Sequence, residues 1–75
     1  MIKSTLKVGL VGCGKIANKH CSVLLSGKIE GLNLGGVCDL NKNKLEEISK
    51  KFKTKKYFNI QDMANDPEID IIAIL

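Results

Sequence analysis

Short apolar runs alternate with amphipathic stretches along the 75-residue chain. Apolar runs predict β-strands, and apolar residues that recur every three or four positions predict helices packed on a sheet. We expect strands over residues 7–11, 32–38, 56–58 and 70–75, helices over 15–25 and 42–53, and a brief helix after residue 59. We expect residues 1–5 to form a frayed lead-in. Alternating strands and helices with right-handed crossovers predict a parallel sheet with helices on both faces.

The predicted helices carry recognisable core stripes and caps. An asparagine precedes the second and third helices, where its side chain can accept a hydrogen bond from a free backbone N–H. The residues expected to face the sheet are Ala17, Cys21, Leu24 and Leu25 in the first helix, and Leu45, Ile48 and Phe52 in the second.

The last stretch, residues 69–75, is almost wholly apolar, which is typical of a parallel strand buried on both faces. The sequence stops inside this stretch, without a turn or a polar tail. We therefore expect residues 1–75 to be a fragment of a longer protein, containing the first four strands of its sheet.

A glycine turn joins the first predicted strand to the first predicted helix. Residues 12–17 read Gly-x-Gly-x-x-Ala, between a strand and a helix as dinucleotide binding requires. Gly12 permits the tight turn, Gly14 leaves the backbone open to a pyrophosphate, and Ala17 lets the helix pack closely. The free N–H groups and the dipole of the helix start then attract phosphate.

Asp39 ends the second predicted strand at about 20 residues past the glycine turn, the spacing of the acid that binds the adenosine ribose. A carboxylate there accepts hydrogen bonds from the ribose hydroxyls and repels a 2′-phosphate, which favours NAD over NADP. The alternative is a surface turn aspartate. Lys42 and Lys44 leave NADP open because either could pair with a 2′-phosphate, although solvated lysines at a helix start are the simpler account.

Other residues near the turn have candidate roles. We expect Lys15 and Ile16 to pack beside the dinucleotide and to bind it through backbone N–H groups, although simple solvent exposure explains Lys15 equally well. Cys13 lies at a helix N-terminus, where a thiol pKa can fall, so the open readings are a redox role and a small loop residue. His20 lies about 9 Å along the helix axis from the turn, and we expect a packed or capping histidine.

Composition narrows the class of protein. Apolar residues make up 44% of the chain, which argues against disorder. No apolar run approaches the roughly 20 residues of a membrane span, and no signal peptide is recognisable. Three cysteines, Cys13, Cys21 and Cys38, have no Cys-x-x-Cys spacing. We therefore expect neither a disulfide framework nor a metal site, and a cytoplasmic location.

Every basic residue is a lysine, and the net charge of +4 is modest. The lysine-rich segment 42–56 could be read as a nucleic-acid patch. It has no arginine, and only Tyr57 and Phe58 are available for stacking, in a strand that we expect to be buried. The exposed face of an amphipathic helix is the better interpretation, so we expect no nucleic-acid partner.

These segments together resemble the amino-terminal part of the glucose–fructose oxidoreductase/inositol dehydrogenase (Gfo/Idh/MocA) family. The match rests on residues 8–20, 37–39, 57 and 65–74. The resemblance implies the N-terminal portion of a doubly wound Rossmann domain, with a substrate domain to follow. Gly35-Gly36 departs from the family pattern, so we expect a looser second strand or a close approach by another backbone or a ligand. The cofactor-binding positions that the resemblance implies are Gly12, Cys13, Gly14, Lys15, Ile16, Asp39, Leu40, Ile74 and Leu75.

The resemblance also implies a function. Family members transfer a hydride between a nicotinamide and a hydroxyl of a sugar, cyclitol or nucleotide-sugar, and their catalytic lysine and histidine lie beyond this sequence. We expect NAD as cofactor, NADP less so, and a homo-oligomer at full length. The alternatives are a non-catalytic module that senses NAD(H) or a nucleotide, and an S-adenosylmethionine site. The latter is disfavoured by Ala17 and by the prompt helix start.

Overall fold

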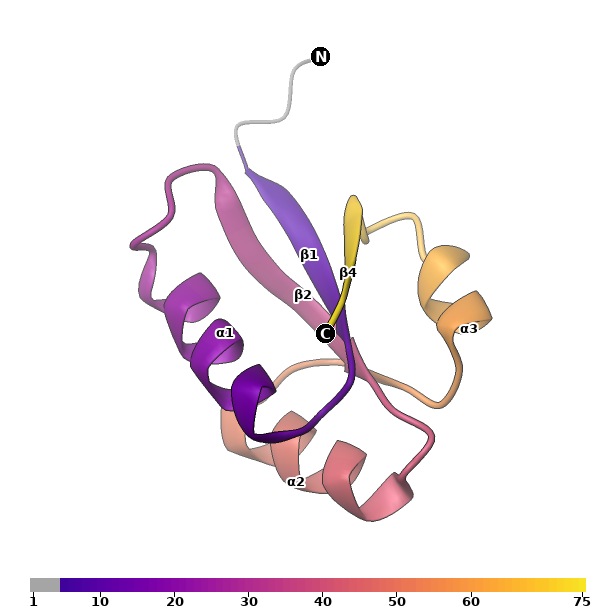
Figure 1. Ribbon diagram of the computed structural model, residues 1–75. Helices are drawn as coiled ribbons and strands as arrows, with labels where there is room; N and C mark the ends of the chain where they lie inside the picture. Colours follow the sequence, from indigo (N-terminus) through magenta and orange to yellow (C-terminus); the bar gives the residue numbers. More distant parts are fainter. Residues whose placement is uncertain (1–4) are drawn as a thin grey trace.

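A computed structural model describes residues 5–75 (Figure 1), so most of the expected lead-in lies outside the described residues. Four parallel strands form one sheet in the order β3-β2-β1-β4. The strands are β1 (Leu6–Val11), β2 (Leu32–Cys38), β3 (Lys56–Tyr57) and β4 (Ile71–Ile74), and the helices are α1 (Lys15–Ser26), α2 (Lys42–Phe52) and α3 (Ile60–Ala64). The predicted α/β class and order of elements are confirmed.

The helices lie on both faces of the sheet. Figure 1 shows α1 and α2 on one side and α3 on the other. Along β1, Val8 and Leu10 belong to the core beneath α1 and α2, whereas Met63 of α3 lies directly over Gly9 on the opposite face. The chain moves outward from β1 to β3 and then returns across the sheet to β4. The direction of winding therefore reverses between β1 and β4, as in a doubly wound sheet.

The core fills the space between the sheet and the two longer helices. Ala17, Cys21 and Leu24 are buried as predicted, but Leu25 is 47% exposed. Successive helical residues point about 100° apart, so a helix that turns Leu24 toward the sheet carries Leu25 away from it. Phe52 is partly buried against the core. The buried core residues are Val8, Leu10, Cys13, Cys21, Leu24, Leu34, Val37, Leu45 and Ile48.

The glycine pair in β2 marks an irregularity, as predicted. Val8 pairs with Leu34 and Gly9 with Gly36, which leaves Gly35 as an extra residue in a β-bulge. A Cβ on Gly36 would lie 2.5 Å from Cε2 of the Tyr57 ring. The close neighbours of this pair are thus side chains, together with the Lys55 carbonyl, and the bare backbone makes room for them.

Two expectations of burial are wrong for the described residues. Ile71 is 40% exposed and Ile74 73% exposed, because β4 pairs with β1 alone and forms an edge of the four-stranded sheet. Phe58 is 49% exposed because β3 ends before it, at the other edge. Within residues 5–75, none of the helices has the length and hydrophobicity that crossing a bilayer requires.

Candidate functional site

The candidate site lies at the carboxyl ends of β1 and β2, beside the point where the winding of the sheet reverses. Gly12 follows β1 with a φ of +107°, which L-residues rarely adopt, and its N–H donates to the Cys38 carbonyl oxygen at 2.8 Å. The sharp turn of the chain into α1 therefore requires a glycine at position 12. In open α/β sheets, ligands bind at the carboxyl ends of the strands near such a reversal.

Gly14 has a different reason to be glycine. Its φ of −77° suits any residue, and a Cβ built on it would meet nothing within 4 Å. Folding therefore does not demand glycine at this position. The open space in front of it is what the close approach of a ligand to the backbone requires.

The start of α1 is uncapped by side chains. Asn41 accepts a hydrogen bond from the Lys44 N–H at 3.1 Å, and Asn59 one from the Asp62 N–H at 2.9 Å, at the starts of α2 and α3. Gly14 offers α1 no such bond, and the first turn of α1 has no acidic residue. Its first N–H groups and its helix dipole thus face the open space at Gly14, an arrangement that favours an anion.

Lys15 and Ile16 are both exposed beside this opening, Ile16 at 58%. Lys15 and Lys44 line one cleft of about 270 Å³ between α1 and α2, which also includes Gly14. The structure therefore brings two lysines to one side of the glycine turn. Either could face a phosphate group bound there.

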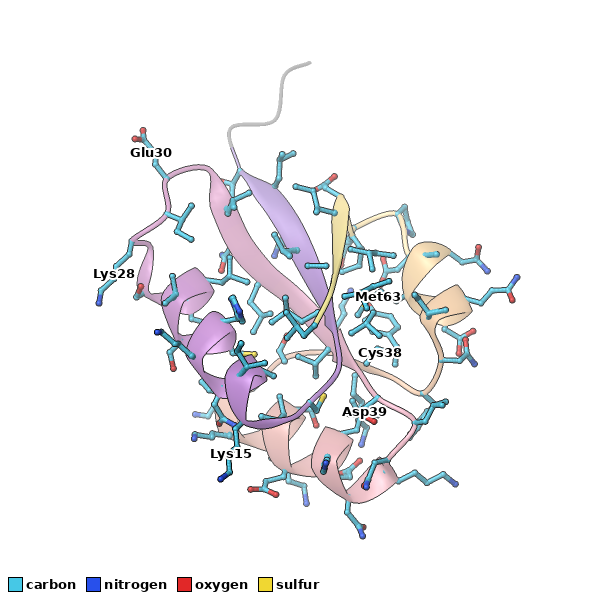
Figure 2. All side chains as sticks on the ribbon, viewed as in Figure 1. Lys15, Lys28, Glu30, Cys38, Asp39 and Met63 are labelled. Carbon is cyan, nitrogen blue, oxygen red and sulfur yellow. The ribbon has the colours of Figure 1, made fainter. Side chains whose placement is uncertain are left out.

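Asp39 lies directly after β2, close to the glycine turn (Figure 2). Its Oδ2 accepts a hydrogen bond from the Cys13 N–H at 2.8 Å, and its Oδ1 accepts one from the Asn41 N–H at 2.8 Å. These two bonds, from Asn41 and then Cys13, and the charge of Lys44 lower the pKa of the Asp39 carboxyl below its ordinary value. Asp39 is therefore ionised at neutral pH, as an acceptor for sugar hydroxyls must be.

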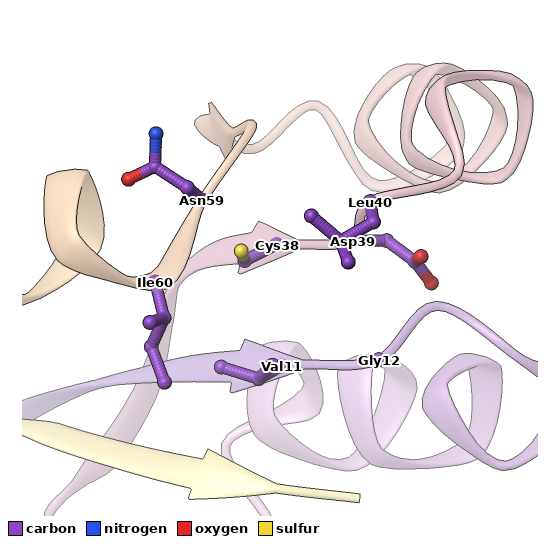
Figure 3. Close-up of a pocket in the computed structure, with 7 residues that line it drawn as sticks. All are labelled: Val11, Gly12, Cys38, Asp39, Leu40, Asn59 and Ile60. Atoms are coloured by element: carbon purple, nitrogen blue, oxygen red, sulfur yellow. The ribbon is translucent and has the colours of Figure 1, made fainter.

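A pocket of about 430 Å³ opens beside Asp39 (Figure 3). Leu40, on its rim, is 87% exposed, and Ile60 extends toward Val11 from the opposite side. The amide of Asn59 points away from the pocket, in keeping with its role as helix cap. The walls are therefore mainly apolar, which suits the flat faces of a heterocyclic base. The lining residues are Val11, Gly12, Cys38, Asp39, Leu40, Asn59 and Ile60.

Asn59 and Ile60 line the pocket, although no sequence motif marks them as site residues. The only local signal was the capping role of Asn59, which says nothing about a ligand. These residues reach the pocket because the chain turns back after β3 and crosses the sheet toward β4.

Ile74 and Leu75 lie on opposite faces of the sheet. Ile74 is the register partner of Val11 and so points to the face that carries the pocket. The Leu75 N–H donates to the Val11 carbonyl oxygen at 3.0 Å, but its side chain lines a groove on the α1 face together with His20. His20 is exposed, so the expectation of a packed histidine is wrong.

Cys13 points inward from the glycine turn, and its side chain is 4% exposed. Burial, and then the negative charge of Asp39, raise the pKa of the Cys13 thiol to about 11. Burial of the thiol therefore favours a small structural loop residue over a redox role at this position. Cys21 and Cys38 are also buried and free, so both serve as small core residues.

Known proteins match this chain over most of its length. Residues 6–75 match an oxidoreductase family with an NAD-binding Rossmann fold. The chain is 29% identical over 72 residues to inositol 2-dehydrogenase of Salmonella paratyphi B, which covers 93% of this chain and 21% of that enzyme. It is 31% identical over 68 residues to L-aspartate dehydrogenase of Methanocaldococcus jannaschii, covering 91% of this chain and 25% of that enzyme.

A solved structure shows the same fold. The chain superposes with a TM-score of 0.79 and 25% identity on myo-inositol dehydrogenase from Lactobacillus casei in complex with NAD(H) and myo-inositol, covering 95% of this chain and 21% of that one. The chain thus spans between a fifth and a quarter of the length of these relatives. Since the family match covers nearly all of its residues, the chain belongs to the Gfo/Idh/MocA oxidoreductase family, whose members share an NAD-binding Rossmann fold.

Proposed function

We propose that this chain binds NAD, with the pyrophosphate at the glycine turn and the adenosine in the pocket beside Asp39. The observation that carries the proposal is the bare, uncapped start of α1 at Gly14, next to an ionised carboxylate and an apolar pocket. The N–H groups of Lys15 and Ile16 would face the phosphates. Leu40 and Ile60 would contact the base, with Ile74 close by.

The preference for NAD over NADP rests on Asp39. Its negative charge lies where a 2′-phosphate would have to fit, and two like charges in contact disfavour binding. Lys44 lies near enough to act on the Asp39 carboxyl and would soften this repulsion without cancelling it. We therefore expect NADP to bind more weakly than NAD, but measurably.

In the full-length protein we propose a dehydrogenase that acts on a hydroxyl of a sugar, cyclitol or nucleotide-sugar. NAD, when bound, supplies a hydride acceptor. The residues of this chain bind and orient it, and we assign no catalytic acid or base among them. Support for a hydroxyl substrate comes from the names of the inositol dehydrogenases, while the L-aspartate dehydrogenase relative favours an amino acid as the second candidate. The buried, unpaired thiols are compatible with the cytoplasm, which we propose as the location, and we propose a homo-oligomer.

Calorimetric titration of the full-length protein with NAD, NADP and S-adenosylmethionine tests the cofactor. We expect NAD to bind most tightly. Tighter binding of NADP would contradict the role given to Asp39, and tighter binding of S-adenosylmethionine would contradict the dinucleotide site. Turnover with NAD and myo-inositol, glucose 6-phosphate or L-aspartate then identifies the substrate class. NAD binding without turnover on any of a broad set of polyols and amino acids would favour a sensing module.

A further inference from the structure

The glycine turn is fastened to the end of β2 at successive residues. The Gly12 N–H donates to the Cys38 carbonyl oxygen at 2.8 Å, and the Cys13 N–H donates to Oδ2 of Asp39 at 2.8 Å. The Cys13 side chain adds a third attachment, since it is buried in the core with Sγ 3.7 Å from the same Cys38 carbonyl. Of these contacts, the bond to Asp39 is the one made by a polar side chain.

The carboxylate is itself held in place from the other side. Its Oδ1 accepts the Asn41 N–H at 2.8 Å, so its two oxygens bridge the backbone before α2 and the backbone of the glycine turn (Figure 3). The Asp39 carboxylate points away from Asn59 and Ile60 and lies on the side of Gly12. An ionised carboxylate accepts about four hydrogen bonds, so acceptor capacity remains for a ligand.

We propose that Asp39 is a positioning residue for the phosphate-binding turn, in addition to being a candidate ribose ligand. Its carboxylate fixes the peptide between Gly12 and Cys13 and thereby the path of the backbone into Gly14 and α1. This role extends the proposed function, because it matters for ligand binding only if phosphate is bound at this turn.

The physical reason is that the backbone at Gly12 does not define its own path. Gly12 lacks a side chain and has wide conformational freedom, so its native φ must be imposed by the groups around it. Charge-assisted hydrogen bonds to a carboxylate are stronger than neutral ones. Loss of the Asp39 acceptor would deprive the part-buried Cys13 N–H of this partner and would let the turn sample other paths.

Amide hydrogen exchange of the full-length protein, measured by NMR without ligand, directly tests the hydrogen bond from the Cys13 N–H to Asp39. We expect the Cys13 amide to be protected in the wild type, and Asp39→Ala to speed its exchange by about tenfold or more, from the typical strength of a hydrogen bond to a charged group. Asn41→Ala is the matched control, because it perturbs the start of α2 without removing the acceptor of the Cys13 N–H.

Binding of inorganic pyrophosphate separates the positioning role of Asp39 from its role in ribose recognition, since this probe has no ribose. Asp39→Asn and Asp39→Ala both remove the charge, but only asparagine keeps an oxygen that can accept the Cys13 N–H. We expect Asp39→Asn to protect the Cys13 amide better and to bind pyrophosphate about three- to tenfold more tightly than Asp39→Ala, the range of a neutral hydrogen bond.

Equal pyrophosphate affinity of the two variants, or unprotected exchange of Cys13 in the wild type, would overturn the proposal. If Asp39→Ala does not fold, the exchange rates of the Cys13 amide in the wild type and in Asp39→Asn still test the proposal. If the wild type binds neither NAD nor pyrophosphate, the proposed function fails. The exchange experiment still tests the hydrogen bond from the Cys13 N–H to Asp39 independently.

Discussion

Replacing either glycine of the turn by alanine separates the requirements of folding from those of binding. At Gly14 the φ of −77° is allowed to alanine, and the added Cβ meets nothing within 4 Å. Alanine restricts the unfolded chain, which stabilises by about 0.4–1 kcal/mol. It is also a poorer N-cap than glycine, which costs a similar amount. These effects offset, so we expect Gly14→Ala to change the free energy of unfolding by less than about 0.5 kcal/mol.

The same Cβ stands where we place the pyrophosphate. It would hold the phosphate away from the first N–H groups of α1, and the loss of one or two hydrogen bonds to a charged group corresponds to about 1.5–3 kcal/mol each. We therefore expect Gly14→Ala to weaken NAD binding by at least about tenfold. Gly12→Ala should instead lower the free energy of unfolding by about 1–3 kcal/mol, because a side chain at a φ of +107° is strained.

Urea unfolding and calorimetric titration of both variants, alongside the wild type, measure the two quantities. The reasoning fails if Gly14→Ala binds NAD as tightly as the wild type, since the open space would then have no connection to the ligand. It also fails if Gly14→Ala loses several kcal/mol of stability, since its glycine would then be a requirement of the fold.

Three further predictions concern the scaffold. Gly36→Ala should lower the free energy of unfolding by about 1–3 kcal/mol in urea, because its Cβ would lie 2.5 Å from the rigid Tyr57 ring; an unchanged value would mean that the ring moves aside freely. Asn41→Ala should cost about 1 kcal/mol in the same assay through loss of the α2 cap, and Asn41→Ser should restore most of it. Folding raises the pKa of the Cys13 thiol from 9.0 to about 11, so this thiol ionises less readily in the folded state than in the unfolded state. This contribution to stability should be complete below pH 9 and lost as the pH rises toward 11, with alkylation at pH 8 slow until the protein is unfolded. Rapid alkylation of native Cys13 at pH 8 would contradict its burial.

The order and type of the elements were predictable because their signals are local. Apolar periodicity identified all four strands and the two long helices, and the spacing of Gly12, Gly14 and Ala17 predicted a strand–turn–helix unit. A helix cap and an apolar stripe each depend on a few neighbouring residues. The sequence carries this information without reference to the rest of the fold.

Contacts between distant segments were decided by the tertiary structure alone. The pocket gains Ile60 because the chain crosses back over the sheet, and Asp39 meets the Cys13 N–H because parallel strands bring β1 and β2 to the same edge. The pKa of the Cys13 thiol is raised because its side chain turns into the core, where burial and then the charge of Asp39 disfavour the thiolate. The exposure of Ile74 likewise follows from the place of β4 at the sheet edge. Spacing along a chain specifies which residues are available, but only packing determines which groups face each other and how far water is excluded from them.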